Sequence, residues 1–555
     1  MSESSQTAEP GVTSNDPEPI VESAAAAKAM WPKRLIVLAV FLGVILWLQA
    51  MSGTYHSEFG SHPDEAAHYV TGLMVRDYLT TGIPKNPMRF AEAYYDHYPK
   101  VALGHYPPVF YVFEAVWSLV FSGSRTSILV FMALQSLALS AMVFLSLERY
   151  AGFWLGVAGG AFCALAPLTQ QYDSMVMADA MLAVFCFLSG LAFVRYIVAN
   201  RPVDSLLFGV FASAAILTKG SALFLAAVPL AALILCGRLD LLKRWSFWIP
   251  APVVAILCGP WMALTYKIAG DGWTGDTIPV FFQKAVPYFA AGWVHIIGVA
   301  LILPALVGIL SNRLFRWAKP EPGLAAFTAV MTAIPLCLTA FSSLVPAGLE
   351  LRYLLPGLPC VVALAILGIA AIVRVFPDLS SSRRVRLQWA LVAACAIGFL
   401  GVTFQIPRKS FTGFREVAEE LERSQPKEPC EIIVSSDARG EGALVSELAM
   451  NGRKPAWTVR RASKLLAASD WMGRGYTLLF ENEEKLSDYL QKAAISWIVI
   501  DESIPSDLRA EHHKLLENTL LKNPEKYRLI KSFSVIRGDA SSASGVRLYH
   551  KEPRS

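Results

Sequence analysis

Two adjacent carboxylates, Asp64 and Glu65, lie shortly after the first long apolar run of the chain, at residues 35–51. A carboxylate so close to a membrane is costly to hold without a partner or a task. In a group transfer, one acid of such a pair can remove the proton from an attacking hydroxyl, and the other can hold a cation against a leaving phosphate. The alternative is a pair of solvated loop acids. Pro63, the flanking histidines and the apolar sequence around the pair favour the chemical role.

Three more charged residues border apolar runs. Asp179 begins one run, where it can cap a helix N-terminus or face a cavity and orient Asp64, a cation or an acceptor. Lys219 lies between two runs, where it can extend its ammonium toward water or bind a phosphate as a point charge. Arg352 enters another run, and its guanidinium suits a pair of phosphate oxygens. The alternative for Arg352 is an internal ion pair with Glu350.

An aromatic and histidine-rich sequence closes the first loop. It comprises Tyr94-Tyr95-Asp96-His97-Tyr98-Pro99 and Gly104-His105-Tyr106-Pro107-Pro108. Aromatic residues near a membrane surface commonly form an interfacial belt. The other interpretation is that His105 and its neighbours form a wall of a donor site, because an imidazole can bind phosphate or a metal ion.

The composition indicates an integral membrane protein with many spans. Of the 555 residues, 54% are hydrophobic and only 17% are charged, whereas soluble domains have about 25% charged residues. The mean hydropathy is +0.44. The net charge of +5 is modest and in a membrane protein mainly sets topology, which argues against nucleic-acid binding. All cysteines except Cys430 lie within apolar runs, and no disulfide framework or zinc-ligand spacing is present.

Long apolar runs predict eleven membrane spans, with a large outer loop after the first. Two of the runs, 204–217 and 221–236, are shorter than the usual ~20 residues and can be tilted halves of a kinked hairpin. The predicted spans are 35–51, 126–147, 152–169, 175–197, 204–217, 221–236, 246–266, 288–311, 322–343, 351–375 and 387–405.

The apolar stretch 107–121 decides the topology, because the side of every later loop depends on whether it spans. It opens with two prolines and contains Glu114. Basic residues concentrate in cytoplasmic loops, and they follow this rule here only if 107–121 does not cross. We therefore expect an interfacial or re-entrant helix. On this topology the outer side holds Asp64, Glu65, His97, His105, Asp173, Asp179, Lys219, Glu350 and Arg352.

The two ends of the chain differ from its apolar middle, residues 31–405. Residues 1–30 combine acidic residues with Ser, Pro and Ala, which predicts a disordered tail that is not a signal peptide. Residues 406–555 have mixed charge and predict a small soluble α/β domain on the outer side. Helical patterns there include Phe414–Arg423 and Glu483–Ala494. The β-type runs are Glu431–Val434, Tyr476–Phe480, Trp497–Asp501 and Val546–Tyr549.

Several common catalytic motifs are missing. The sequence has no phosphate-binding loop, dinucleotide fingerprint, metalloprotease helix or nucleophile elbow. Without a nucleotide-binding module, an activated substrate must carry its own leaving group and be delivered within the membrane. That requirement indicates a sugar linked to a polyprenyl phosphate.

In its charged and aromatic motifs, the chain resembles the bacterial branch of the dolichyl-phosphate-mannose–protein mannosyltransferase superfamily. The members of this superfamily are membrane glycosyltransferases of the GT-C fold. It looks most like the group that contains the aminoarabinose transferase of lipid A and the lipopolysaccharide-modifying transferases of rhizobia. The C-terminal region carries no such resemblance. The matching pieces are Pro63-Asp64-Glu65 with Tyr69, His105-Tyr106-Pro107-Pro108, Ala178-Asp179-Ala180, Thr218-Lys219-Gly220 and Arg352-Tyr353-Leu354-Leu355-Pro356.

The resemblance implies a reaction and its acids. A polyprenyl-phosphate sugar would donate its sugar, with inversion, to a lipid, glycan or protein acceptor outside the cytoplasm, from a bacterial inner membrane. Asp64 would be the base, Glu65 its neighbour or a cation ligand, and Asp179 a supporting acid. A transporter or flippase of lipid-linked sugars is one alternative, although transporters tend to place polar groups at mid-membrane and to show repeated halves. An oligosaccharide ligase with a diphosphate donor is the other.

The resemblance also implies a donor site. Lys219 and Arg352 would hold the donor phosphate, with Tyr353 and His105 beside them. Relatives such as the aminoarabinose transferase have Glu-Lys where this chain has Gly104-His105, so no metal ligand is carried over at that point. A divalent cation stays an open alternative through Glu65 and the nearby histidines.

Overall fold

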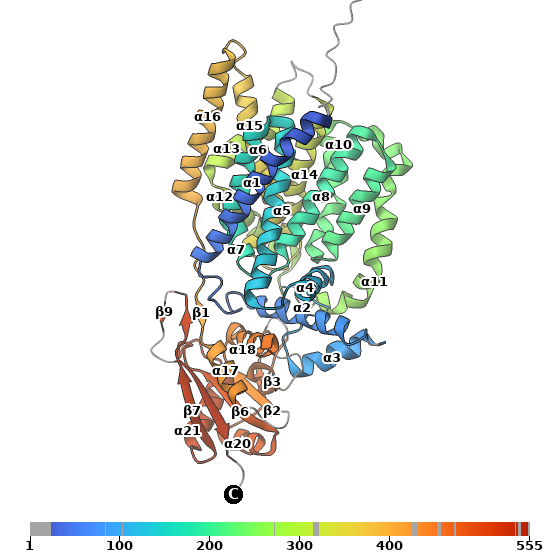
Figure 1. Ribbon diagram of the computed structural model, residues 1–555. Coiled ribbons are helices and arrows are strands. Elements are labelled where there is room, and N and C mark those ends of the chain that lie inside the picture. Colours follow the sequence, from blue (N-terminus) through green and yellow to red (C-terminus); the bar gives the residue numbers. More distant parts are fainter. Residues whose placement is uncertain are drawn as a thin grey trace, which may run out of the picture.

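The computed structural model shows a helical bundle with a smaller α/β domain at one end (Figure 1). Most of the tail predicted at residues 1–30 falls outside the described residues, and helix α1 (Ala24–Met51) begins within it. The described residues are 24–83, 85–102, 104–270, 272, 274–314, 321–424, 430–451, 457–470, 473–538, 540–541 and 545–552.

Seven helices in the described part of the chain are long and apolar enough to cross a membrane, which confirms the predicted multi-span protein. Two further predicted spans are bent pairs, with 58° between α6 (Phe153–Leu165) and α7 (Pro167–Asp173) and 108° between α12 (Ile278–Ile297) and α13 (Val299–Leu314). Counting each pair as one span gives nine. The seven lie in α1, α5 (Arg125–Ala151), α8 (Asp179–Ala199), η3 and α11 (Trp245–Trp248, Pro250–Gly270), α14 (Pro322–Leu344), η4 and α15 (Leu351–Gly357, Leu358–Arg374), and α16 and η5 (Ser381–Gly398, Phe399–Thr403).

The two short predicted spans form short helices inside the bundle. They are α9 (Pro202–Ile216), and η1 (Gly220–Ala226) continued by α10 (Val228–Cys236). α9 packs on α8 and α11, and α10 packs on α14. The extended backbone of Lys219 separates the two helices, so this lysine lies at a break in the helical structure rather than along a helix.

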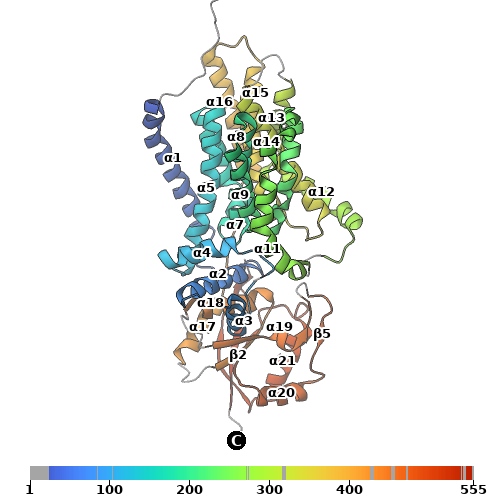
Figure 2. The same ribbon diagram turned by 90° about the vertical axis from the view of Figure 1, so that its right-hand side faces the viewer.

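The first loop lies at one end of the bundle. It contains α2 (Glu65–Thr80), α3 (Pro87–His97) and α4 (Val109–Val120). With 12 residues, α4 is about 18 Å long, too short for a hydrocarbon core of ~30 Å. Figure 2 shows α4 lying across the lower end of α5. The structure therefore agrees with a non-spanning helix at 107–121.

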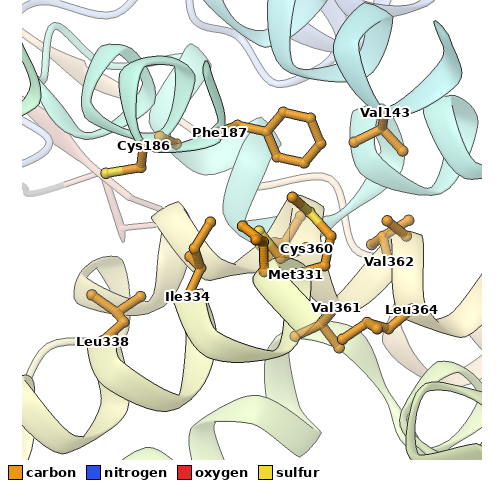
Figure 3. Packing of buried hydrophobic residues seen from close by; sticks show 14 of the residues in the cluster. Val143, Cys186, Phe187, Met331, Ile334, Leu338, Cys360, Val361, Val362 and Leu364 are labelled. Atoms are coloured by element: carbon orange, nitrogen blue, oxygen red, sulfur yellow. The ribbon is translucent and has the colours of Figure 1, made fainter. Parts of the chain in front are cut away.

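The core of the bundle includes apolar side chains of four helices that pack against one another. Figure 3 shows Val143 of α5, Phe187 of α8, Met331 of α14 and Cys360 of α15 packed together, and all four are buried. Because η4 leads directly into α15, the packing of α15 also fixes the position of Arg352 at the end of the bundle.

Small residues let α13 and α15 approach closely. A Cβ atom on Gly308 would lie 2.1 Å from the Leu364 carbonyl oxygen, and one on Gly368 would lie 1.8 Å from the Pro304 oxygen. Glycines at such crossings allow backbones within a membrane to come into contact. A side chain at either position would push α15 away from α13.

The C-terminal domain is built on a five-stranded sheet of order β3-β2-β6-β10-β7. β2 is parallel to β3 and β6, and β10 is antiparallel to β6 and β7. Three of the four predicted β-type runs are strands of this sheet. The strands are β2 (Cys430–Ser435), β3 (Trp457–Arg461), β6 (Ile495–Asp501), β7 (Tyr527–Phe533) and β10 (Val546–Lys551).

The fourth predicted run, 476–480, contains only the two-residue strand β5 (Thr477–Leu478), which pairs with β4 (Ala467–Ala468). Its leucines are partly exposed, so it lies on the surface instead of in the sheet. The remaining elements are η2 (Leu239–Lys243), β1 (Phe411–Thr412), α17 (Phe414–Arg423), α18 (Ala438–Asn451), α19 (Ala462–Leu465), α20 (Glu483–Lys492), α21 (Glu511–Lys522), β8 (Ile536–Arg537) and β9 (Ala540–Ser541).

The C-terminal domain contacts the first loop. The Glu58 carboxylate accepts hydrogen bonds from the backbone N–H groups of Gly413, Phe414 and Arg415, at 2.9, 3.1 and 2.8 Å, and so caps the N-terminus of α17. A buried ion pair joins Arg125 of α5 to Glu447 of α18, and α18 packs on α2. Figures 1 and 2 place this domain and α2–α4 at the same end of the bundle.

Candidate active site

Asp64 and Arg352 form the centre of the site. Asp64 directly precedes α2, and Arg352 lies in η4. Asp64 Oδ2 accepts hydrogen bonds from Nη1 and Nη2 of Arg352 at 3.2 and 3.3 Å, and from the hydroxyl of Tyr106 at 3.0 Å. The Asp64 side chain is 20% exposed whereas that of Arg352 is 5% exposed, so the acid is the more accessible partner.

Glu350 and His62 surround the same guanidinium. Arg352 Nε lies 2.7 Å from Glu350 Oε2, and Nη2 donates to Oε1 at 2.9 Å. His62 lies between the two acids, because its Nδ1 accepts the Asp64 N–H at 3.1 Å and its Nε2 is 3.7 Å from Glu350 Oε2. The ion pair with Glu350, considered from the sequence as an alternative, thus exists together with the contact to Asp64.

A second ion pair joins Asp179 and Lys219. Lys219 Nζ donates to Asp179 Oδ1 at 2.7 Å, and both side chains are buried. Asp179 is the first residue of α8, and Ala178 occupies the N-cap position. Asp179 Oδ1 therefore faces the lysine, and Asp179 does not serve as the N-cap of α8.

The rings of Tyr106 and Tyr353 connect the two ion pairs. Lys219 Nζ lies 5.1 Å from the centre of the Tyr353 ring and 6.0 Å from that of Tyr106. The Arg352 guanidinium lies 5.7 Å from the Tyr353 ring. Cations at such distances are attracted to the face of an aromatic ring. Four predicted site residues, Asp64, Asp179, Lys219 and Arg352, are therefore brought together around two tyrosines.

His68 is part of this group, although the sequence identified it only as a neighbour of Asp64. Its ring centre lies 4.5 Å from that of Tyr106, and its Nδ1 is 3.0 Å from the Tyr111 hydroxyl. Burial lowers the pKa of His68 to about 3, so the imidazole is neutral at physiological pH. The signal in the sequence was its spacing, because residues four apart lie on the same face of a helix.

The protonation states follow from the same contacts. Burial would raise the pKa of Asp64, but the positive charge of Arg352 outweighs it and, together with the hydrogen bond from Tyr106, lowers the pKa. Burial and the charge of Asp64 raise the pKa of Tyr106 well above its usual value. Asp64 is therefore ionised in this arrangement, and Tyr106 keeps the proton that it donates.

Glu65 has a different set of partners from Asp64. Its Oε2 accepts the Ser61 N–H at 3.0 Å, and its Oε1 accepts the Val176 N–H at 3.4 Å. Lys409 Nζ lies 3.4 Å from Oε1. The adjacent acids thus point into two separate clusters, because Asp64 contacts Arg352 whereas Glu65 contacts Lys409.

The last two histidines of the first loop, His97 and His105, have different surroundings. His97 Nδ1 lies 3.3 Å from the Trp457 carbonyl oxygen and 3.1 Å from the Thr458 hydroxyl, so it joins α3 to the C-terminal domain. His105 is partly buried next to Tyr106, and its place in a donor site stays a prediction.

Residues 105–263, less than half of the chain, match the family model of dolichyl-phosphate-mannose-protein mannosyltransferase. No curated protein sequence matches significantly. Among solved structures, ArnT from Cupriavidus metallidurans bound to undecaprenyl phosphate is 14% identical, with a TM-score of 0.53 over 93% of this chain and 99% of ArnT. The oligosaccharyltransferase AglB from Archaeoglobus fulgidus, in complex with an inhibitory peptide and a dolichol-phosphate, is 12% identical, with a TM-score of 0.53 over 92% of this chain and 75% of AglB.

The agreement extends over nearly the whole of both chains for ArnT, in its apo state as well, with a TM-score of 0.54. Because the two sequences are only 14% identical, this agreement establishes the fold alone. The protein has the GT-C fold. The group around Asp64 and Arg352 lies where the GT-C helical bundle meets its C-terminal domain.

A metal ion is one question that the GT-C relatives raise, because one structure of the Archaeoglobus fulgidus enzyme is a complex with Zn and sulfate. In the part of the chain that the structure describes, no three His, Cys, Asp or Glu residues are grouped to hold a metal. Asp64 and Glu350 both direct their carboxylates to Arg352, a cation that the chain itself supplies. These residues do not fit a divalent-cation site, so the cation predicted as an alternative has no ligand set among them.

Proposed function

We propose that this protein transfers a sugar from a polyprenyl-phosphate donor to an acceptor hydroxyl at the outer face of a bacterial cytoplasmic membrane. The observation that supports it is one group of residues that joins an accessible carboxylate, Asp64, to two buried cations, Arg352 and Lys219. Undecaprenyl phosphate and dolichol-phosphate are bound in the structures of ArnT and AglB, which supports a lipid-linked phosphate as leaving group here.

In this proposal Arg352 and Lys219 bind the donor phosphate. A guanidinium binds two phosphate oxygens at once, and an ammonium adds a point charge. Both cations face the ring of Tyr353, which keeps them near each other. A phosphate held between them would replace Asp64 as a partner of Arg352. His105 would contribute from the end of the first loop.

The chemical step is a displacement at the anomeric carbon. The acceptor oxygen attacks this carbon on the face opposite the phosphate, and Asp64 accepts the hydroxyl proton. A new carbon–oxygen glycosidic bond forms while the bond from the anomeric carbon to the phosphate oxygen breaks, so the configuration inverts. The phosphate oxygen keeps the electron pair, and Lys219 and Arg352 offset its negative charge.

Asp179 has a supporting role in this proposal. Its hydrogen bond of 2.7 Å to Lys219 holds the ammonium in place, and its negative charge favours the charged form of the lysine. Glu65 takes no part in the chemical step because its carboxylate contacts Lys409 and backbone N–H groups.

The proposed orientation places the site and the C-terminal domain outside the cytoplasm. It rests on the alternation of basic loops together with a non-spanning α4. Alkaline phosphatase fused to the C-terminus should be active in cells, because this reporter folds only outside the cytoplasm. A fluorescent C-terminal green fluorescent protein fusion with inactive phosphatase would contradict the orientation.

The test of the proposed reaction uses membranes that contain the full chain, an extract of acceptor lipids and glycans, and radiolabelled undecaprenyl-phosphate sugars. We expect label to pass from the donor to an acceptor that stays labelled after mild acid removes the lipid-phosphate sugar. Label that crosses the membrane without forming a new bond would indicate a flippase instead. Transfer only from undecaprenyl-diphosphate oligosaccharides would indicate an oligosaccharide ligase.

A further inference from the structure

Lys409 is a buried lysine just beyond the last membrane helix. Its side chain is 6% exposed, and its backbone N–H donates to the Ser52 carbonyl oxygen at 2.7 Å. Lys409 therefore lies where the connection to the C-terminal domain returns to the start of the first loop. A buried ammonium is costly unless acceptors surround it.

The acceptors of Lys409 come from two loops. Its Nζ lies 3.4 Å from Glu65 Oε1 and donates a hydrogen bond to the Ser174 carbonyl oxygen. Glu65 also accepts the N–H of Val176, so the same carboxylate and ammonium are both bound to the segment 174–176. This segment leads from α7 to Asp179 at the start of α8.

The Glu65–Lys409 pair therefore ties together the two segments that carry proposed catalytic acids. Glu65 is the neighbour of Asp64 in sequence, and the segment 174–176 ends shortly before Asp179. A third bond, from the Ser61 N–H to Glu65, closes the turn that precedes Asp64. Any shift of the ammonium would move one acid relative to the other.

We infer that Lys409 is a positioning residue of the proposed transfer reaction, which sets the placement of Asp64 relative to Asp179 and Lys219 through Glu65 and Ser174. The inference rests on the proposed function. Lys409 touches no group that would react, so it acts only by geometry. On this inference the segment after the last span has a role in the reaction, because it supplies the ammonium of Lys409 that contacts both loops.

The first experiment compares Lys409→Met, Glu65→Gln and the double variant in purified protein. Because a displacement of about 1 Å in a reacting group can cost ~100-fold in rate, we expect kcat to fall about 10- to 100-fold in Lys409→Met. The donor KM should stay within about twofold, since Arg352 and Lys219 remain. The double variant should be no slower than Lys409→Met, because removing both charges leaves neither unpaired.

Lys284→Met is the matched control. Lys284 of α12 also pairs with an acid, Asp276, at 3.0 Å, but its side chain is 53% exposed. An exposed pair of this kind contributes little, so the control should keep the wild-type kcat. A Lys409→Met protein with reduced yield but unchanged kcat per folded molecule would overturn the inference, because Lys409 would then serve folding only.

Hydrogen exchange gives a readout that does not depend on turnover. In Lys409→Met we expect faster amide exchange in peptides covering 58–66 and in those covering 173–180, with the helices α5 and α15 unchanged. Faster exchange in only one of the two segments, or in neither, would contradict the inference even if the protein proved to catalyse another reaction. If the wild-type protein transfers no sugar but both segments exchange faster in Lys409→Met, the result would contradict the proposed function and leave the structural role of Lys409 in place.

Discussion

The carboxylate of Asp64 and the guanidinium of Arg352 meet at 3.2 and 3.3 Å across 288 positions of sequence. A carboxylate held by a guanidinium is a poor base, and the pKa of Asp64 is lowered accordingly. A donor phosphate that engages Arg352 would weaken this pairing and add a negative charge nearby. Both changes raise the pKa of Asp64. Donor binding would thus make Asp64 a better base only when a sugar is present to be attacked.

The pH dependence of the reaction tests this coupling. In the free protein the lowered pKa keeps Asp64 ionised to pH values below its usual pKa of about 3.9. The acid limb of kcat/KM, which reports the free protein, should therefore lie at lower pH than the acid limb of kcat, which reports the donor complex. The donor phosphate is a diester and does not titrate in this range. Initial rates measured between pH 3.5 and 8 should fall toward acid at saturating donor before they fall at low donor, and two profiles that coincide would contradict the exchange of partners.

Replacing Asp64 should separate donor binding from chemistry. In Asp64→Asn the base is lost, and general-base catalysis of this kind is worth ~100- to 10,000-fold in rate. Binding of undecaprenyl phosphate should be retained or tightened, because Arg352 loses its competing anion. Radiolabelled transfer and a lipid-binding titration measure the two effects. Asp276→Asn, at an exposed ion pair, is the control, and an Asp64→Asn protein with full activity would refute the base assignment.

The sequence was sufficient to predict which charged residues come together, because membrane proteins rarely place ionisable groups beside apolar runs without a use. Asp64, Asp179, Lys219 and Arg352 were all found in this way, and the alternation of basic loops placed them on one side. The broken span at Gly298 was not predicted, because a hydropathy pattern shows how long an apolar run is and does not show that the helix bends by 108° within it. Its positive φ of 79° is a conformation that glycine adopts at little cost.

The partners within the site were harder to predict than its members. Adjacent acids were treated as one pair, yet Asp64 is the last residue before α2 and Glu65 the first residue within it, so their side chains diverge. Lys409 was overlooked because it lies in the connection to the C-terminal domain, far from any motif. Its contact with Glu65 depends on the folded path of that connection, which neither hydropathy nor spacing describes.

The Asp179–Lys219 ion pair is expected to show strong non-additivity. Removing one partner of a buried pair leaves an unpaired charge and costs about 3–5 kcal/mol. Lys219→Met and Asp179→Asn should therefore each lower the melting temperature, and the double variant should recover most of the loss. Transfer should remain low in the double variant, because no ammonium is left to bind the phosphate. Thermal unfolding and transfer assays on the three proteins check this, and additive losses of stability would contradict a direct pair.

Lys100 provides a prediction about stability and pH. Its Nζ donates to the Pro63 carbonyl oxygen at 3.0 Å, and a Cβ atom on Gly442 of α18 would lie 2.9 Å from its Cε. Lys100 is thus enclosed between the loop of Asp64 and the C-terminal domain. Burial, with the nearby charge of Arg461, lowers the pKa of Lys100 to about 7, so folding disfavours its charged form.

The sign of the effect follows from proton counting. Between pH 7 and the usual lysine pKa of about 10.4, Lys100 is protonated in the unfolded chain and neutral in the folded one. The unfolded state then binds more protons, so the contribution of Lys100 to folding stability rises with pH across this range. Wild-type protein should gain stability relative to Lys100→Met when the pH is raised from 7 to 9, as measured by thermal unfolding. Lys85→Met, at an exposed lysine of the same loop, is the control, and its melting temperature should change with pH as that of the wild type does. If the melting temperature of Lys100→Met also changes with pH in parallel with the wild type, Lys100 keeps its ordinary pKa.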